Sequence, residues 1–495
     1  MSARSGTEDA TVWALLLGSS LIYFFSINAA DNDLWGHVLF GRDWLARGAL
    51  PLTDPYAYTT AGRAWVNHEW LTQVVFALVF RWAGSPGLLL LKFGVASATF
   101  VLLLGTMRLR TSRAYVWGAV GLLTVAVLAR GFAIRPQIVT YCGVAATLAL
   151  LDAYQRGHRH AGWVFPVMFV VWANLHGGFA LGLAILGLFA TSELIWSRGR
   201  SLHPCMVLLA SVAATALNPF GPRLLVYIWN ELSRAHPITE WQAAVPSDAA
   251  QFVFFAMLGL LVPTLPFGRR WREDGSRIVL ALGVGVLALR HQRHTPVFAL
   301  CAAAPLAAQL DGAVDWLTRN TAIALSLAAQ RLIVAALFIL AALQVTFTGL
   351  RLYHDGLQIV FDPTEYPTAA VKALEEARAQ GNLAVPLDWG EYVLWFLTPQ
   401  VKVSLDGRFA TVFPEQVVED NFTFFRGATG WRRLIDDYPT EAVLLPANSA
   451  CPIQREPGWL RVYSDPVAEI YVRADRAPIF RTGDLARIRA PGVFP

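Results

Sequence analysis

The stretch "TVWALLLGSSLIYFFSINAADNDLWGH" (residues 11–37) contains the two features that decide the fold. An apolar run ends near residue 28, and Asp31, Asp33 and His37 follow within the next ten positions. The run falls within the range of about 17–25 residues that a helix needs to cross a bilayer. The stretch therefore predicts a membrane helix that brings two carboxylates and an imidazole to one membrane surface.

The rest of the chain repeats this apolar character. Of its 495 residues, 55% are hydrophobic and 15% are charged, whereas a soluble domain carries about 25% charged residues. The chain is thus predicted to be an all-α polytopic membrane protein with about eleven transmembrane helices. The expected spans are residues 11–28, 87–107, 114–130, 137–153, 162–174, 178–196, 204–217, 251–267, 276–290, 295–310 and 321–349.

The distribution of arginine predicts the orientation in the membrane. Four basic loops, at residues 108–113, 154–160, 197–203 and 267–274, fall on the same side if the N-terminus is cytoplasmic. The net charge of +5 is therefore read as an orientation signal, with no nucleic-acid partner expected. Residues 69–84 are too short for a span and contain Arg81, so we expect a helix that lies along the outer membrane interface.

The composition changes near residue 350. Residues 1–350 are predicted to form the membrane domain, which includes a long first outer loop with interfacial helices at residues 29–86. Residues 351–495 alternate short strand and helix patterns and predict a small α/β domain outside the membrane. Asp388, Trp389, Glu391, Asp406 and Arg408 lie at predicted strand ends, where α/β folds often bind ligands, but helix capping and ion pairing explain them at least as well.

The predicted topology collects unusual polar residues on the outer face. Arginine there runs against the usual orientation preference, which points to an anionic ligand such as a phosphate. Asp33 or Asp31 could act as a general base, while cations stabilise a departing phosphate. The candidate substrate-binding residues are His37, His68, Glu69, Trp65, Arg135, Asn174, His176, Arg290, Arg293 and His294, with Trp65, Tyr56 and Tyr58 offering ring faces to a sugar.

Several motifs carry a resemblance to a known family. The carboxylates of "DNDLWGH", the "HEW" motif at residues 68–70, "RPQ", "WANLHGGF" and "LNPFG" resemble GT-C superfamily membrane glycosyltransferases and GT-C-like bacterial proteins. That superfamily includes protein O-mannosyltransferases and lipid A aminoarabinose transferases. The resemblance implies a polyprenyl-phosphate-linked sugar donor, an acceptor in the cell envelope, Asp33 or Asp31 as the base, and location in a bacterial inner membrane.

Other interpretations stay open from the sequence. The carboxylates could simply solvate a helix end, His68 and Glu69 could cap a helix, and Asn174 and His176 could join helices by hydrogen bonds. The chain could bind lipid-linked glycans without catalysis, or, with less support, transport them. No metal or other cofactor is expected to be required, although a divalent cation at Asp31 and Asp33 remains an alternative.

Overall fold

The computed structural model describes residues 3–231, 239–268, 271–321, 326–476 and 492–495. Two residues of the fourth basic loop (269–270) and the start of the last expected span (322–325) lie outside the described residues. The chain divides into two compact units. Unit 1 comprises Met1–Asn28 and Leu89–Leu357, and unit 2 comprises Ala29–Leu88 and Gln358–Pro495.

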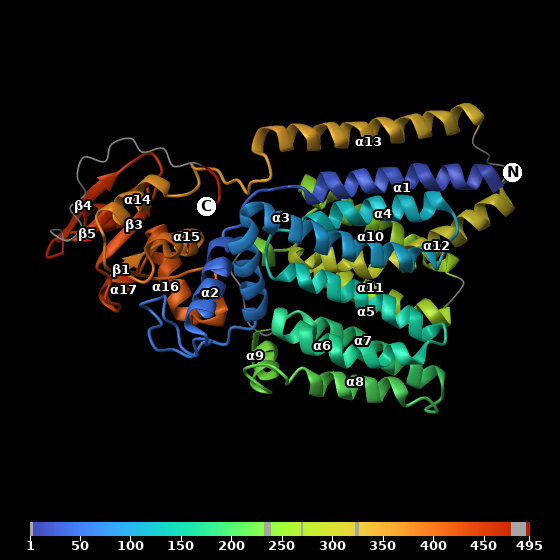
Figure 1. The fold of residues 1–495 in the computed structure, drawn as a ribbon, viewed down its shortest axis with the longest axis horizontal. Helices are drawn as coiled ribbons and strands as arrows, with labels where there is room; N and C mark the ends of the chain where they lie inside the picture. Colours follow the sequence, from blue (N-terminus) through green and yellow to red (C-terminus); the bar gives the residue numbers. More distant parts are fainter. Residues whose placement is uncertain (1–2, 232–238, 269–270, 322–325, 477–491) are drawn as a thin grey trace. The chain divides into compact units, whose positions relative to one another are not determined.

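Unit 1 is a helical bundle (Figure 1). Each of the eleven expected spans coincides with a helix. Five helices are long and apolar enough to cross a membrane, and four shorter apolar helices accompany them among the described residues. The number of eleven crossings therefore stays a prediction. The helices are α1 (Ala3–Phe25), α4 (Ala114–Ala129), α5 (Gln137–Gln155), α6 (Val164–Leu175), α7 (Phe179–Trp196), α8 (His203–Ala214), α9 (Arg223–Glu231), α10 (Phe252–Thr264), α11 (Trp271–Arg290), α12 (Thr295–Asn320) and α13 (Leu327–Asp355), together with the end of α3.

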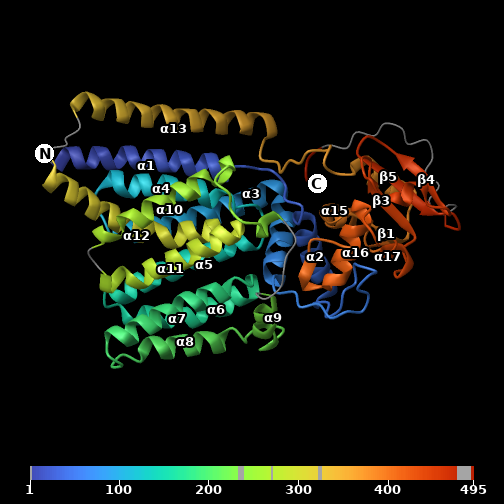
Figure 2. The same cartoon turned by 180° about the vertical axis from the view of Figure 1, so that it is seen from behind.

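Small residues let these helices approach closely, as is usual where water provides no hydrophobic driving force. A side chain at Gly118 of α4 would overlap the Trp13 ring of α1, and side chains at Gly143 and Gly182 would overlap Trp172 of α6. Helix α13 packs beside α1, and both views show the two helices side by side (Figures 1 and 2). Gln344 of α13 bonds the hydroxyl groups of α1 there, at 2.7 Å from Ser19 Oγ.

Helix α3 (Trp70–Arg108) belongs to both units. Its backbone leaves helical geometry at Gly84, where φ is 57° and ψ is −152°. This positive φ suits glycine, which lacks the Cβ that would make the conformation costly. The segment expected to be an interfacial helix is thus a helix separated from the following span by a break.

Unit 2 contains the expected C-terminal α/β fold. A five-stranded sheet has the order β2-β1-β3-β5-β4. Strand β1 pairs in parallel with β2 and β3, whereas β5 is antiparallel to β3 and β4. The strands are β1 (Gly381–Ala384), β2 (Val401–Val403), β3 (Ala442–Pro446), β4 (Trp459–Ser464) and β5 (Ala468–Arg473), and the helices are α2 (Leu34–Arg47), α14 (Thr368–Glu376), α15 (Leu387–Leu397), α16 (Glu415–Arg426) and α17 (Arg433–Asp436), with the start of α3.

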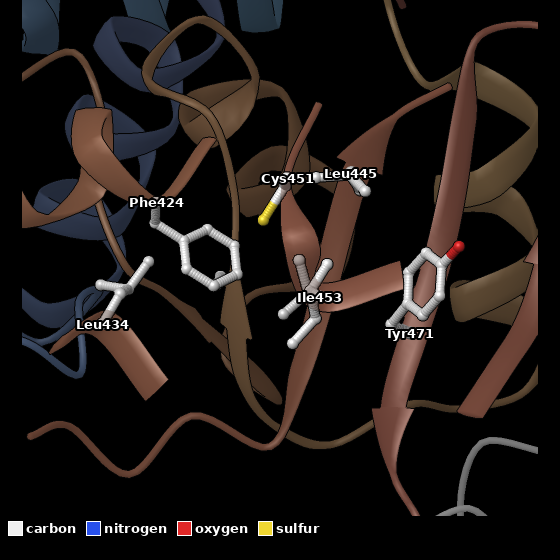
Figure 3. Close-up of a cluster of buried hydrophobic side chains, with 8 residues drawn as sticks. Phe424, Leu434, Leu445, Cys451, Ile453 and Tyr471 are labelled. Carbon is white, nitrogen blue, oxygen red and sulfur yellow. The ribbon is translucent and has the colours of Figure 1, made fainter. Parts of the chain in front are cut away.

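The core of this sheet is a cluster of fully buried side chains. Phe424 of α16 and Leu434 of α17 pack with Cys451 and Ile453 on one face of strands β3 and β5 (Figure 3). Strands β1 and β3 alternate little between polar and apolar residues because helices cover them, as is typical of the parallel part of a sheet.

The first loop is part of this α/β unit. The sequence-based division placed residues 29–86 in the membrane domain, whereas the structure groups Ala29–Leu88 with the C-terminal residues. The physical reason is backbone pairing. Tyr58 N–H donates to Val403 O, and Val403 N–H donates to Tyr56 O, both at 3.1 Å. The loop thereby covers the edge strand β2, which would otherwise expose unpaired backbone groups.

Candidate active site

The two aspartates after α1 take different roles at the start of α2. Asp33 is the N-cap residue of this helix, but its carboxylate makes no capping bond to the helix backbone. The Asp31 carboxylate instead accepts the N–H of Asp33 at 3.0 Å, which forms a local turn. Both side chains are partly exposed. A simple helix cap therefore accounts for neither carboxylate.

Glu391 of α15 lies beside Asp33. Its Oε2 accepts the backbone N–H of Gly36 at 3.0 Å, so α15 and α2 are joined at this point. A Cβ built on Gly407 would overlap Oδ1 of Asp33 and lie 2.8 Å from Oε1 of Glu391. A Cβ on Gly36 would overlap the Glu391 carboxyl group itself. The two glycines thus make room for a pair of carboxyl groups.

A buried ion triad of Arg408, Asp406 and Asp54 lies in the same unit as this pair of carboxyl groups. Arg408 binds Asp406 with two of its nitrogens, at 2.9 Å and 2.6 Å, and binds Asp54 with a third, at 2.6 Å. The aspartates are 0% and 4% exposed, respectively, and Asp54 also accepts the N–H of Tyr56 at 2.9 Å. The triad therefore ties the first loop to the segment after β2 by charge-assisted bonds, which are stronger than neutral ones.

The environment favours a proton on Glu391. Burial raises the pKa of its carboxyl well above the usual range, and the negative charges of Asp33 and Asp406 raise it further. Arg408 and the Gly36 N–H act in the opposite direction. Burial and the nearby Asp31 also raise the pKa of Tyr366, whose hydroxyl donates to Asn32 Oδ1. The site thus combines an accessible carboxylate, a neutral carboxyl and a neutral phenol.

The aromatic residues of the first loop are inside the unit. Trp65 is 3% exposed, and its ring lies 4.9 Å from the Arg408 guanidinium carbon. Tyr56 and Tyr58 are 2% and 6% exposed. The expectation that these rings stack on a sugar is wrong for this arrangement, because they pack against the ion triad and the edge of the sheet.

His37, His68 and Glu69 come together, as expected for a shared site. Glu69 lies 3.9 Å from His37 Nδ1 and 3.6 Å from His68 Nε2. His37 comes from the buried face of α2, and Glu69 directly precedes α3. The three residues belong to the same unit as Asp31 and Asp33.

The remaining candidates lie in unit 1. Asn174 donates to Val170 O at 2.8 Å and to Leu217 O at 2.9 Å. His176 Nδ1 lies 2.7 Å from Thr140 Oγ1 and accepts the Gly178 N–H at 2.9 Å. The contacts with Leu217 and Thr140 reach other segments of the bundle, whereas those with Val170 and Gly178 are local.

Two of the arginines predicted to face outward, Arg135 and Arg293, contact one short 3-10 helix, η2 (Thr239–Trp241). Arg135 Nη1 lies 2.9 Å from Glu240 Oε1, and Arg293 stacks over the Trp241 ring at 4.5 Å. The His294 ring also faces Trp241, at 6.1 Å between centroids. Arg290 is exposed at the end of α11. Arg135, Arg293 and His294, which the sequence predicted to hold a phosphate together, thus lie close to adjacent residues of η2.

Lys92 of α3 was missed from the sequence. It is 3% exposed within an apolar span, and its Nζ donates to Ile27 O, four residues before Asp31. Arg351 of α13 also binds the end of α1, at 3.1 Å from Tyr23 O and 3.0 Å from Ser26 Oγ. An ionisable residue inside a membrane span usually has a functional role. The rarity of lysine, with three in the chain, was the signal that could have identified it.

Within the described residues, no three His, Cys, Asp or Glu side chains are grouped as a metal site.

Comparisons with known proteins place the fold. No protein-family model matches the chain, and no curated protein matches it. Solved structures do match. ArnT from Cupriavidus metallidurans in the apo state aligns with a TM-score of 0.54 at 13% identity, over 94% of this chain and 99% of that chain. The structure of ArnT bound to undecaprenyl phosphate aligns with a TM-score of 0.55 at 12% identity, over 99% and 100%.

These alignments extend over nearly the whole of both chains, so the likeness includes the helical bundle and the C-terminal sheet. At this level of identity the likeness is one of fold. The chain thus shares the fold of these two ArnT structures, and five of its described helices are long and apolar enough to cross a membrane.

Proposed function

We propose that this protein is an inverting glycosyltransferase that moves a sugar from a polyprenyl-phosphate donor to an acceptor outside the cytoplasm. The fold supports this proposal, because a structural neighbour with the same architecture is bound to undecaprenyl phosphate. The acceptor is an envelope lipid, glycan or protein that offers a hydroxyl or amine. The protein would act at the outer face of a bacterial inner membrane, with its N-terminus in the cytoplasm.

Asp33 is the proposed base. In the reaction, the acceptor oxygen or nitrogen forms a bond to the anomeric carbon while the bond from that carbon to the phosphate oxygen breaks. The bonding electrons leave with the phosphate, and Asp33 takes the proton of the acceptor. Asp33 is preferred to Asp31 because it lies beside the buried Glu391 carboxyl at the start of α2. A base of this kind contributes about 10²–10⁴-fold to the rate.

Cations would stabilise the leaving phosphate. Lys92 and Arg351, which both bind the last residues of α1, are proposed as one pair of phosphate ligands. Arg293 is a second candidate, since it forms no ion pair with any described carboxylate and its guanidinium stacks on the Trp241 ring. Arg135, Arg290 and His294 belong to the same group of cations. His37, His68 and Glu69 are proposed to contact the sugar or the acceptor.

The observation that carries the proposal is the position of Asp33. It is a partly exposed carboxylate directly after the first span, it does not cap its helix, and a buried carboxyl supports it from α15. We do not expect a metal ion to be required, because the cations listed above can neutralise the phosphate.

The test compares cells that lack the protein, complemented with wild type, Asp33→Asn, Asp31→Asn or Asp43→Asn. Asp43 is a matched control, because it is a carboxylate of the same helix that bonds the Tyr56 hydroxyl at 2.8 Å, away from Asp33. Mass spectrometry would profile polyprenyl-phosphate sugars and envelope glycans. We expect one lipid-linked sugar to accumulate, and one glycan to lose a residue, in both the null strain and Asp33→Asn. A wild-type profile for Asp33→Asn would favour a protein that binds lipid-linked glycans without catalysis.

A further inference from the structure

Glu391 is an unusual residue for its helix. Helix α15 has the sequence "LDWGEYVLWFL", and Glu391 is 2% exposed among its apolar residues. A buried carboxyl group without partners costs several kcal/mol, so such residues are retained only with specific contacts. Its two oxygens have different surroundings. Oε2 accepts the Gly36 N–H, whereas Oε1 lies over Gly407 next to Asp33 Oδ1.

The charges around Glu391 come from two neighbouring elements. Asp33 faces it from the start of α2, and Asp406 and Arg408 face it from the segment after β2. Arg408 is shared between Asp406 and Asp54, so the triad keeps a net negative charge. Helix α14 also packs on α15, but its Glu375 acts on Tyr392. Two adjacent carboxyl groups in such surroundings cannot both ionise readily.

Burial favours a proton on Glu391, which is 2% exposed, whereas Asp33 is partly exposed. A protonated Glu391 can donate from Oε1 toward the Asp33 carboxylate while Oε2 keeps its bond to Gly36. This arrangement would fix the rotation of the Asp33 carboxylate toward the acceptor.

We propose that Glu391 is a positioning residue for Asp33: it holds the proton of the carboxyl pair and orients the Asp33 oxygen that deprotonates the acceptor. This inference rests on the proposed function for its catalytic consequence. The proton balance is simple. The pair begins with one proton, on Glu391; it gains the acceptor proton, on Asp33; and it returns that proton to water after the product leaves. The α/β domain thus supplies a residue that the reaction needs.

The experiment uses the full-length protein in detergent or nanodiscs. The donor is the undecaprenyl-phosphate sugar that the mass-spectrometric profile of the null strain identifies. The variants are Glu391→Gln, Glu391→Ala and Asp33→Asn. The control is Asp420→Asn, which changes another buried carboxyl of the same unit that bonds Gln416 at 2.8 Å. Two readouts are measured: the dependence of kcat and KM on pH, and the infrared carbonyl stretch of a protonated carboxylic acid.

We expect wild-type kcat to fall at alkaline pH, as Glu391 loses its proton and with it the bond to Asp33. Glu391→Gln keeps a donor that does not titrate, so it should retain kcat and lose this alkaline fall. Glu391→Ala should lower kcat by about 10²-fold with little change in KM, because the base is misplaced. The infrared band should disappear in Glu391→Gln, change in Asp33→Asn and stay unchanged in Asp420→Asn.

Two results would overturn the inference. One is a wild-type pH profile for Glu391→Gln with its alkaline fall intact. The other is an infrared band of a protonated carboxyl that is still present in Glu391→Gln or is unchanged in Asp33→Asn. The infrared readout separates this inference from the proposed function. If the wild-type protein transfers no sugar, the proposed function fails, and the response of the band to Asp33→Asn still decides whether the two carboxyls share a proton.

Discussion

Removal of the Arg408 guanidinium should destabilise unit 2 more than any surface substitution. Arg408→Leu would strand the buried carboxylates Asp54 and Asp406, which now share three short bonds to this side chain. Breaking a buried ion pair by removing one partner costs about 3–5 kcal/mol. For a unit of this size, 1 kcal/mol shifts Tm by about 2–4 °C, so a fall of about 6–20 °C is expected.

The assay is thermal unfolding of the detergent-solubilised protein followed by tryptophan fluorescence. Trp65 is a local reporter, because its ring lies 4.9 Å from the Arg408 guanidinium carbon. Arg408→Lys should lie between wild type and Arg408→Leu, since it keeps the charge but loses the two-pronged geometry. The control is Arg432→Leu, which removes a half-exposed arginine of the same unit that pairs with Asp436 at 3.0 Å. Such surface pairs contribute little.

The reasoning fails if Arg408→Leu lowers Tm no more than Arg432→Leu does. A triple variant with apolar residues at positions 54, 406 and 408 gives an additional check. It should recover part of the loss, because no buried charge is then left without a partner.

Four other outcomes are expected. Asp33→Asn should abolish transfer while its Tm stays near that of wild type, as glycan profiling and thermal unfolding would show. Lys92→Met should weaken binding of undecaprenyl phosphate at least tenfold relative to Lys402→Met in a lipid-binding assay. Glu391→Gln should be the more stable form at alkaline pH: burial raises the pKa of Glu391 in the folded state, so the stability that its proton confers is full at low pH and is lost as pH rises through that pKa. Measured across pH, the Tm of wild type should rise in acid, relative to that of Glu391→Gln; equal pH profiles for the two proteins would contradict this. Finally, EDTA should leave transfer unchanged, and a loss that Mg²⁺ or Mn²⁺ restores would contradict this expectation.

Local patterns predicted the elements well. Each apolar run became a helix, and residues 351–495, predicted to alternate strands and helices, contain the five strands of the sheet. These patterns depend on the period of the hydrophobic residues, which neighbouring positions in the chain determine. The position of Asp33 just after the first span followed from the same kind of information, whereas the helix that begins there, α2, was not predicted.

The site itself depended on pairings between distant positions. Asp33 and Glu391 are far apart in the chain, and only the close approach allowed by Gly36 and Gly407 makes them neighbours. Trp65 illustrates the opposite error. Its aromatic ring in a polar loop suggested a surface on which a sugar could stack. In the structure the ring instead packs against the guanidinium of Arg408, which is distant in the sequence. A single sequence contains no signal for either pairing.

The pairing of the first loop with strand β2 has a consequence for biosynthesis. Residues 56–58 leave the ribosome more than 300 residues before Val403, the residue that they pair with. Asp33 is therefore synthesised before the whole helical bundle, and Glu391, Asp406 and Arg408 are synthesised after it. A nascent or C-terminally truncated chain inserts its helices with an unfinished site. The surroundings of Asp33 are thus complete only after the C-terminal residues of unit 2 have been made.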